Sequence, residues 1–354
     1  MDNYLTVDAG IAAQSTSDDQ PTANKRVLQE LAAGMNITVI VCTYNRCRSL
    51  VRALDSLAVS VLSETIKWEV LVVDNNSSDQ TRAMVEDFCR RYPGRFRYLF
   101  EPQQGKSHAL NAGIREASGD ILAFVDDDVM VEPIWLQNLT SVLDDSQWAG
   151  SGGRILPARG FDPPRWLAID GPYNLLGALC AYCDPGDVPG ELKDPPFGAN
   201  MAFRKEMFER YGHFRTDLGP FPTSKIGFED TEFGRRLMAG GERLCYAPSA
   251  VVYHEVPENR VRKEFFLEWW FDFGRGSVRG AEKGTGTWEI LKILGRTLLT
   301  ALQWLVTLNS KSRFYRKCRI WYGAGKIVEI YQQARSGNSP GQKLKQQAGR
   351  ESSI

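Results

Sequence analysis

The chain has 354 residues, of which 43% are hydrophobic and 24% are charged, so it is globular and long enough to bury a substantial core. Lysine plus arginine and aspartate plus glutamate both number 43, and this balance gives no argument for nucleic acid or for an acidic partner. Seven cysteines at irregular spacings indicate reduced thiols rather than disulfides, and the one close pair, Cys180 and Cys183, is weak evidence for zinc.

The first 35 residues are expected to form a disordered tail. Residues 1–24 are polar and acidic, and they lack the basic n-region and the apolar h-region of a secretory signal.

From residue 37, short β-branched runs alternate with amphipathic helical stretches. Apolar residues at Leu50, Ala53, Leu54 and Leu57 fit the 3.6-residue period of a helix. Near-continuous apolar strands in such an alternation predict an α/β fold whose parallel sheet is covered by helices on both faces. The predicted strands are 37–43, 68–74, 96–100 and 120–125, and the predicted helices are 46–61, 80–92 and 106–118.

Polar residues follow all four predicted strands. Ligands of open parallel sheets bind outside the carboxyl ends of the strands, so four polar tips at one edge would form the charged pocket that a nucleotide needs. Neither a Gly-x-Gly-x-x-Gly turn nor a Walker lysine loop is present, and phosphates must therefore be bound in another way. The four tips are 43–46, 74–78, 103–106 and 126–128.

The fourth tip is the triplet Asp126-Asp127-Asp128, directly after an apolar run. Because successive strand side chains face opposite ways, Asp126 and Asp128 can share one side while Asp127 points elsewhere. Crowded carboxylates repel one another unless a cation or hydrogen bonds offset the charge, and Mg²⁺ or Mn²⁺ bridging substrate phosphates would do so. The triplet is therefore a candidate metal site, and an acidic turn that caps the next helix is the alternative.

The second half of the chain is less regular. Residues 150–156 are expected to form a strand, and residues 157–196, rich in Pro, Gly and aromatic residues, an ordered excursion that shapes a binding site. Residues 197–204 are expected to be a small-residue turn that leads into a helix. Four aromatic residues could stack on sugars or pack in the core: Trp166, Tyr173, Trp269 and Trp270.

A further helix is expected to open at residues 227–232 and to run to Gly240. Its first turn carries Glu229 and Asp230, although the helix macrodipole alone also favours acids at this position.

The segment 288–306 has the length of a membrane span, but three charged residues leave too short an uncharged run for a crossing. An interfacial helix fits better, because the downstream basic and aromatic residues suit an anionic membrane surface, where a lipid-linked sugar acceptor would reside. The alternative is that these helices pack on the catalytic domain or on a second subunit. The residues concerned are Glu289, Lys292 and Arg296, followed by Lys311, Arg313, Phe314, Tyr315, Arg316, Lys317, Arg319, Trp321, Tyr322 and Lys326.

Seven motifs, in order and at plausible spacings from about residue 37 to about residue 280, together resemble glycosyltransferase family 2. The resemblance implies a GT-A fold, in which a Rossmann-like, mostly parallel central sheet with helices on both faces joins a nucleotide-binding half to an acceptor half. The motifs are VIVCTYNR at 39–46, VVDNNSSD at 72–79, NAGI at 111–114, FVDDD at 124–128, GAN at 198–200, FED at 228–230 and VVYH at 251–254.

The resemblance also implies roles for the residues of the strand tips. Thr43, Asn45 and Asp74 would bind the nucleotide base, and Asp74 could accept a hydrogen bond from a base N–H, which suits uridine and thymidine. Lys106 would neutralise the diphosphate or support the ribose, and a solvated lysine at a helix start is the alternative. Asp127 would belong to the same donor site.

The resemblance implies a metal site as well. Asp126 would approach the ribose or the metal, and Asp128 would ligate the metal, which is Mg²⁺ or Mn²⁺. His254 would complete metal or phosphate binding, and a structural hydrogen-bonding role is its alternative.

Cleavage of a glycosyl phosphate bond builds negative charge on the leaving diphosphate while the sugar gains oxocarbenium character. The metal would stabilise the diphosphate, and Asp230 matches the base that removes the acceptor proton during in-line, inverting attack. Glu229 would orient the acceptor or the base. Because a helix start can aim either acid inward, the two roles are interchangeable at this stage.

The expected enzyme is an inverting, metal-dependent transferase that moves sugar from a UDP-, dTDP- or GDP-sugar to a saccharide or lipid-linked acceptor. It would work in polysaccharide or glycolipid assembly as a cytoplasmic protein at the inner face of the cell membrane, with no nucleic acid partner. A nucleotidyltransferase that makes nucleotide sugars and a non-catalytic sugar-binding scaffold are the alternatives. The expected division is a tail (1–35), a GT-A domain (36–282, with halves 36–130 and 131–282), a helical extension (283–335) and a second tail (336–354).

Overall fold

The computed structural model describes residues 36–221, 226–281 and 286–336. The predicted tails lie outside these residues, apart from Ser336 at the end of the last helix. The division of the chain into domains stays a prediction.

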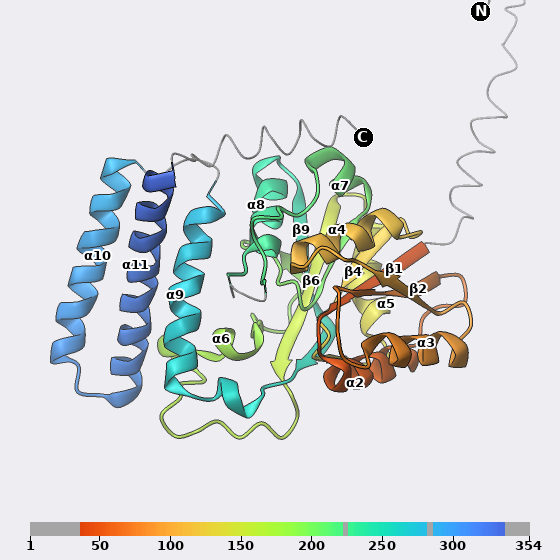
Figure 1. The fold of residues 1–354 in the computed structure, drawn as a ribbon, viewed down its shortest axis with the longest axis horizontal. Coiled ribbons are helices and arrows are strands. Elements are labelled where there is room, and N and C mark those ends of the chain that lie inside the picture. The colour runs from red at the N-terminus through yellow and green to blue at the C-terminus, as the bar shows by residue number, and fades with distance from the viewer. Residues whose placement is uncertain (1–35, 222–225, 282–285, 337–354) are drawn as a thin grey trace, which may run out of the picture.

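The first half of the chain forms four parallel strands of one central sheet (Figure 1). Strands β3, β2, β1 and β4 lie side by side in this order, and all three pairings are parallel. All four predicted strands are confirmed, and their carboxyl ends therefore meet at one edge. The bounds are β1 (Asn36–Thr43), β2 (Lys67–Asp74), β3 (Phe96–Phe100) and β4 (Ile121–Phe124).

The second half of the chain extends the same sheet. Strand β8 pairs antiparallel with β4 and β6, and β9 pairs parallel with β6 and antiparallel with β5 and β7. The expectation of a turn leading straight into a helix at 197–204 is wrong, because the apolar residues 201–203 pair with β4 instead. The bounds are β5 (Val129–Val131), β6 (Trp148–Pro157), β7 (Gly190–Glu191), β8 (Met201–Arg204) and β9 (Arg243–His254).

Helices cover both faces of the sheet, as predicted. Alternating strand residues feed two cores: Val39 and Val41 pack with α2, α3 and α5, whereas Ile40 packs with α4, α7 and α8. This alternation explains why a strand buried on both faces reads as a continuous apolar run. The helices are α2 (Cys47–Ala58), α3 (Thr81–Arg91), α4 (Lys106–Glu116), α5 (Trp135–Thr140), α7 (Glu206–Tyr211) and α8 (Glu229–Ala239).

The excursion at 157–196 is ordered and contains the short helix α6 (Leu176–Cys180). This helix, together with α9 and α11, encloses a third apolar core. Trp166 lies edge-on to Phe266 and Phe314, with ring centroids 5.5 and 5.3 Å away. Trp269 stacks on Phe273 with the centroids 4.8 Å apart, so these tryptophans pack against their own chain.

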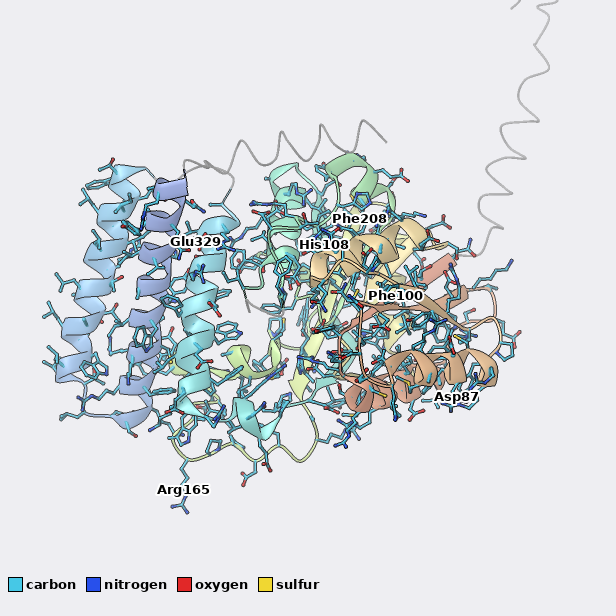
Figure 2. All side chains as sticks on the ribbon, in the orientation of Figure 1. Asp87, Phe100, His108, Arg165, Phe208 and Glu329 are labelled. Atoms are coloured by element: carbon cyan, nitrogen blue, oxygen red, sulfur yellow. The ribbon has the colours of Figure 1, made fainter. Side chains whose placement is uncertain are left out.

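Three long helices stand beside the sheet domain at the C-terminal end: α9 (Lys263–Arg279), α10 (Thr287–Val306) and α11 (Ser310–Ser336). Figure 1 shows α11 between α9 and α10, with α10 outermost. Glu329 of α11 is buried and accepts hydrogen bonds from Arg275 and Arg279 of α9 at 3.1 and 2.5 Å (Figure 2). Within the described residues, none of the helices has the length and apolar character that a membrane crossing requires.

Candidate active site

The aspartate triplet leaves the sheet at the carboxyl edge of the parallel strands. Val125 still donates a hydrogen bond to the carbonyl of Ile40, which extends the β4–β1 pairing by one residue. The chain then turns through Asp126, Asp127 and Asp128 into β5, and the N–H of Val129 closes this turn on the carbonyl of Asp126.

Asp127 points toward the end of β1. Its carboxylate accepts a hydrogen bond from Thr43 Oγ1 at 2.7 Å and another from Arg46 Nη1 at 3.0 Å. Burial raises the pKa of Asp127 to about 6, and the charge of Asp128 adds to this rise while Arg46 opposes it. The structure thus brings Thr43 directly to the triplet.

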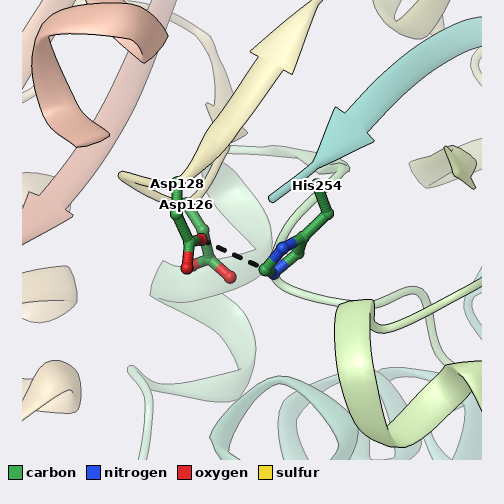
Figure 3. Close-up of side chains that lie close together, drawn as sticks. All are labelled: Asp126, Asp128 and His254. Carbon is green, nitrogen blue, oxygen red and sulfur yellow. Dashed lines mark ion pairs between the residues drawn. The ribbon is translucent and has the colours of Figure 1, made fainter. Parts of the chain in front are cut away.

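Asp126 and Asp128 lie close together and face His254 (Figure 3). Strand β9 brings the histidine there, because His254 is paired with Val129 in the β5–β9 ladder. One potential ligand atom from each of the three side chains lies within 4.8 Å of the other two. Two carboxylate oxygens and an imidazole nitrogen form a donor set that suits Mn²⁺ or Mg²⁺.

The tautomer of His254 is fixed by its own backbone neighbour. The ring Nδ1 lies 2.8 Å from the carbonyl oxygen of Glu255, so this nitrogen carries the proton and donates it. Nε2 then faces the cluster, 3.5 Å from Asp128 Oδ1. A second-sphere hydrogen bond of this kind orients histidines that ligate metals.

Two arginines complete the surroundings of Asp128. Arg46 Nη1 lies 3.0 Å and Arg260 Nη2 lies 3.3 Å from the same oxygen, Oδ2. Arg46 belongs to the first strand tip, and sequence reasoning gave it no role. Arg260, in the short turn Glu258–Arg260, carries no sequence signal, because only the folded chain returns this turn to the triplet.

Lys106, at the start of α4, connects the triplet to the acids of α8. Its Nζ lies 2.7 Å from Asp126 and 3.6 Å from Glu229. Burial alone would lower the pKa of Lys106, but the charges of Asp126 and Glu229 outweigh it and raise the pKa well above its usual value. The position depends on Gly105, whose φ of +129° and close contact with the Phe221 ring leave no room for a side chain.

Glu229 and Asp230 differ sharply in their environment. Glu229 is 4% exposed, and burial raises its pKa to about 7 against the opposing charge of Lys106. Asp230 is half-buried, and its Oδ2 accepts a hydrogen bond from the N–H of Gly198 at 2.7 Å. Asp230 is thus the more accessible of the two acids, and the small-residue turn at 198–200 holds its carboxylate.

The side chain of Asn200 fixes this small-residue turn. Its amide donates to the carbonyls of Ala250 and Arg154 at 2.8 and 3.0 Å, and its oxygen accepts from Trp135 Nε1 at 2.8 Å. A buried asparagine with these three bonds is strongly oriented.

Asn45 and Asp74 hold the loop that follows β2. Asn45 Oδ1 accepts from the N–H of Ser78 at 2.8 Å, and Asp74 Oδ1 accepts from the N–H of Ser77 at 2.9 Å. The other oxygen of Asp74 accepts from Tyr98 Oη at 2.9 Å. These residues therefore form the neighbouring wall of the site, at the tips of β1 and β2.

Comparison with known proteins identifies the chain. The family model described as "Glycosyl transferase family 2" matches residues 38–212. The succinoglycan biosynthesis protein ExoM of Rhizobium meliloti (strain 1021) is 30% identical over 264 residues, which are 72% of this chain and 80% of that protein. The chain belongs to glycosyltransferase family 2. The resemblance noted in the sequence is therefore confirmed, and the protein is a glycosyltransferase.

Two further relatives extend this result. A glucosyl-dolichyl phosphate glucuronosyltransferase of Haloferax volcanii is 25% identical over 68% of this chain and 76% of its own length. The mannosyltransferase PcManGT from Pyrobaculum calidifontis, solved with GDP-Man and Mn²⁺, superimposes with a TM-score of 0.52 and 22% identity, covering 90% of this chain and 80% of that one. The structural match confirms the GT-A fold of this glycosyltransferase.

The raised pKa of Glu229 predicts a pH-dependent contribution to stability. Between about pH 4.5 and pH 7 the folded glycosyltransferase keeps the Glu229 proton that the unfolded chain releases, so its unfolding free energy falls as pH rises through this window. Relative to Glu229→Gln, which cannot titrate, the wild type should lose up to about 3 kcal/mol from pH 4.5 to pH 7.5. Urea unfolding of both proteins at the two pH values measures the difference.

The exposed Glu209, replaced by Gln, controls for the loss of a carboxylate as such. Equal pH dependence in wild type and Glu229→Gln would contradict a proton held at Glu229.

Proposed function

We propose that this glycosyltransferase moves a sugar from a nucleotide-diphosphate donor to a hydroxyl acceptor with inversion at the anomeric carbon. The observation that carries the proposal is the convergence of Asp126, Asp128 and His254 beside the acid pair of α8. At this edge of the sheet, one network would combine a cation site that binds the diphosphate with a carboxylate that takes the proton of the acceptor alcohol. Glycosyl transfer from a diphosphate donor requires both groups.

Asp126, Asp128 and His254 would hold Mn²⁺ or Mg²⁺, and His254 fits this role because its Nε2 faces the two carboxylates. When bound, the ion supplies Lewis-acid stabilisation of the charge that develops on the leaving diphosphate. Arg46 and Arg260 place two more positive charges beside the carboxylate of Asp128. The mannosyltransferase that shares the fold was solved in complex with GDP-Man and Mn²⁺, which supports a donor of this class.

The donor nucleotide would lie over the tips of β1 and β2. Asp74 would accept a hydrogen bond from the base, with Thr43 and Asn45 beside it. Lys106, Asp126 and Asp127 would line the side facing the ribose and diphosphate. UDP-, dTDP- and GDP-sugars are the candidate donors.

Asp230 would act as the base, with Glu229 behind it. The acceptor oxygen forms a bond to the anomeric carbon as the bond to the diphosphate oxygen breaks, and its proton passes to the Asp230 carboxylate. The Gly198 N–H, 2.7 Å from Asp230 Oδ2, directs that carboxylate. Glu229 and Lys106 fix the helix start from the buried side.

Membership of the family favours this function over both alternatives. A nucleotidyltransferase would be expected to carry a Gly-rich basic loop after its first strand, where this chain has Thr43-Tyr44-Asn45-Arg46. The intact network of Lys106, Asp126, Glu229 and Asp230 argues against a non-catalytic scaffold.

The outer face of α10 would bind the inner surface of the cell membrane peripherally, where a saccharide or lipid-linked acceptor is presented. Its apolar residues are exposed along the whole helix, including Leu298, Leu302 and Leu305 at 63%, 54% and 63%. One acid and seven basic residues occur from 287 to 320 in a chain of zero net charge, so this region suits anionic lipid. The charged residues are Glu289, Lys292, Arg296, Lys311, Arg313, Arg316, Lys317 and Arg319.

The donor and metal proposal predicts metal-dependent stabilisation. With Mn²⁺ or Mg²⁺ present, one of UDP, GDP or dTDP should raise the melting temperature, because a ligand at a hundred times its Kd adds about 2.7 kcal/mol to the folded state. Asp128→Asn should lose this metal-dependent rise. Differential scanning fluorimetry measures both, and no shift with any of the three nucleotides would contradict the proposal.

Asp230→Asn should lower the rate of transfer by about 10²–10⁴-fold, because an amide cannot accept the acceptor proton. The nucleotide-induced rise in melting temperature should persist, since Asp230 lies outside the donor wall. Coupled release of nucleoside diphosphate measures the rate. The exposed Asp55, replaced by Asn, is the matched control, and a parallel loss of donor binding would place Asp230 in the donor site instead.

Replacement of Leu298, Leu302 and Leu305 by Glu should reduce sedimentation with phosphatidylglycerol vesicles at least about tenfold, because each buried leucine contributes roughly 1.5–3 kcal/mol. The exposed Val188, replaced by Glu, is the control. Equal sedimentation of wild type and triple variant would contradict membrane binding by α10. A wild-type dimer that the triple variant dissociates in gel filtration would instead assign the face to a second copy.

A further inference from the structure

The residue before the two acids of α8 has an unusual backbone. Phe228 has a φ of +95°, in the left-handed region that bulky side chains rarely adopt. It is the N-cap of α8, and its carbonyl accepts the first helical hydrogen bond, from the N–H of Glu232 at 2.9 Å. A bulky residue keeps such a conformation only where its surroundings enforce it.

Helix α9 provides these surroundings. The ring of Phe228 is almost fully buried, and it lies 5.4 Å from the ring of Phe273. A Cβ added to Gly280 would come within 2.7 Å of Phe228 Cδ1, and one added to Gly276 would come within 3.3 Å of Phe228 Cβ. Because residues four apart share a helix face, these two glycines form the surface on which Phe228 rests.

The opposite face of α9 is attached equally closely to α11. A Cβ on Gly274 would lie 2.2 Å from the carbonyl oxygen of Tyr322, and one on Gly325 of α11 would lie 2.0 Å from that of Phe271. The ion pairs of Glu329 with Arg275 and Arg279 add a charged attachment between the same helices. Helix α9 therefore rests against α11 on one side and supports Phe228 on the other.

We propose that Phe228 is a positioning residue and that the glycine face of α9 sets the direction of Glu229 and Asp230 through it. This inference rests on the function proposed for Asp230. The φ of Phe228 decides where the first turn of α8 points, and therefore whether Asp230 reaches the Gly198 N–H and Glu229 reaches Lys106. A displacement of about 1 Å at such a group costs about 10²-fold in rate, although the chemistry is unchanged.

Gly280→Ala tests the inference, because the added methyl pushes the Phe228 ring while φ at position 280 suits alanine. We expect kcat to fall at least about tenfold with the donor KM changed less than about twofold, since the donor wall lies on the strand tips. Gly295→Ala is the matched control, because a Cβ there meets open space on α10.

The smaller side chain in Phe228→Leu/Gly280→Ala makes room for the methyl group, so this double variant should recover at least about threefold in kcat over Gly280→Ala. A loss of activity that does not arise from contact with Phe228 would not be relieved in this way. Wild-type kcat in Gly280→Ala, or strictly additive effects in the double variant, would overturn the inference.

Hydrogen exchange separates this inference from the proposed function. In Gly280→Ala the amides of residues 229–234 should exchange faster than in the wild type, while those of β1 and β2 remain unchanged. If Gly280→Ala shows this faster exchange but the wild-type protein transfers no sugar, the proposed function is refuted and the positioning by α9 is retained. Unchanged exchange at 229–234 would overturn the positioning, whatever the activity.

Discussion

The site depends on balancing crowded negative charge at one edge of the sheet. Asp127, Asp128 and Glu229 are each at most 5% exposed, and Asp126 adjoins them. Carboxylates removed from water are costly unless positive partners accompany them. The partners come from three separate places: Arg46 after β1, Lys106 at the start of α4, and Arg260 after β9. The charges of the site are therefore balanced by segments from both halves of the chain, and the site forms only when the sheet that holds these segments is complete.

Lys106 has a special place in this balance because it contacts both acidic groups. Its bond to Asp126 belongs to the proposed donor and metal side, and its ion pair with Glu229 belongs to the proposed acceptor side. Any positive charge that arrives at Asp126 competes with Lys106 for that carboxylate and leaves more of the lysine's charge to Glu229. The two sides of the site are thus electrostatically coupled through one ammonium group.

The sequence predicted the parallel strands and their polar tips because both are local patterns: β-branched runs of the right length, each followed by polar residues. It also predicted that Asp126 and Asp128 lie together, and their cluster with His254 agrees with this, although the triplet forms a turn after β4 and not part of a strand. Strand β8 was missed because its four residues are too few to show a period, and its antiparallel partner lies far away in the sequence. Arg260 and the support of Phe228 by Gly280 were out of reach for the same reason, because each contact exists only after distant segments have packed.

The C-terminal helices carry two proposed roles on opposite sides of one element. Helix α11 contacts α9, whose far face supports Phe228, and it also contacts α10, whose far face is apolar and exposed. Packed helices lie about 8–10 Å apart, so the axis of α10 is roughly two such spacings from that of α9. Substitutions of the outer leucines of α10 therefore do not contact Phe228 or displace Glu229 and Asp230. A single methyl group at Gly280, on the inner face of α9, contacts Phe228 directly. Attachment to a surface and alignment of the acids can accordingly change independently, although both depend on the same helix between them.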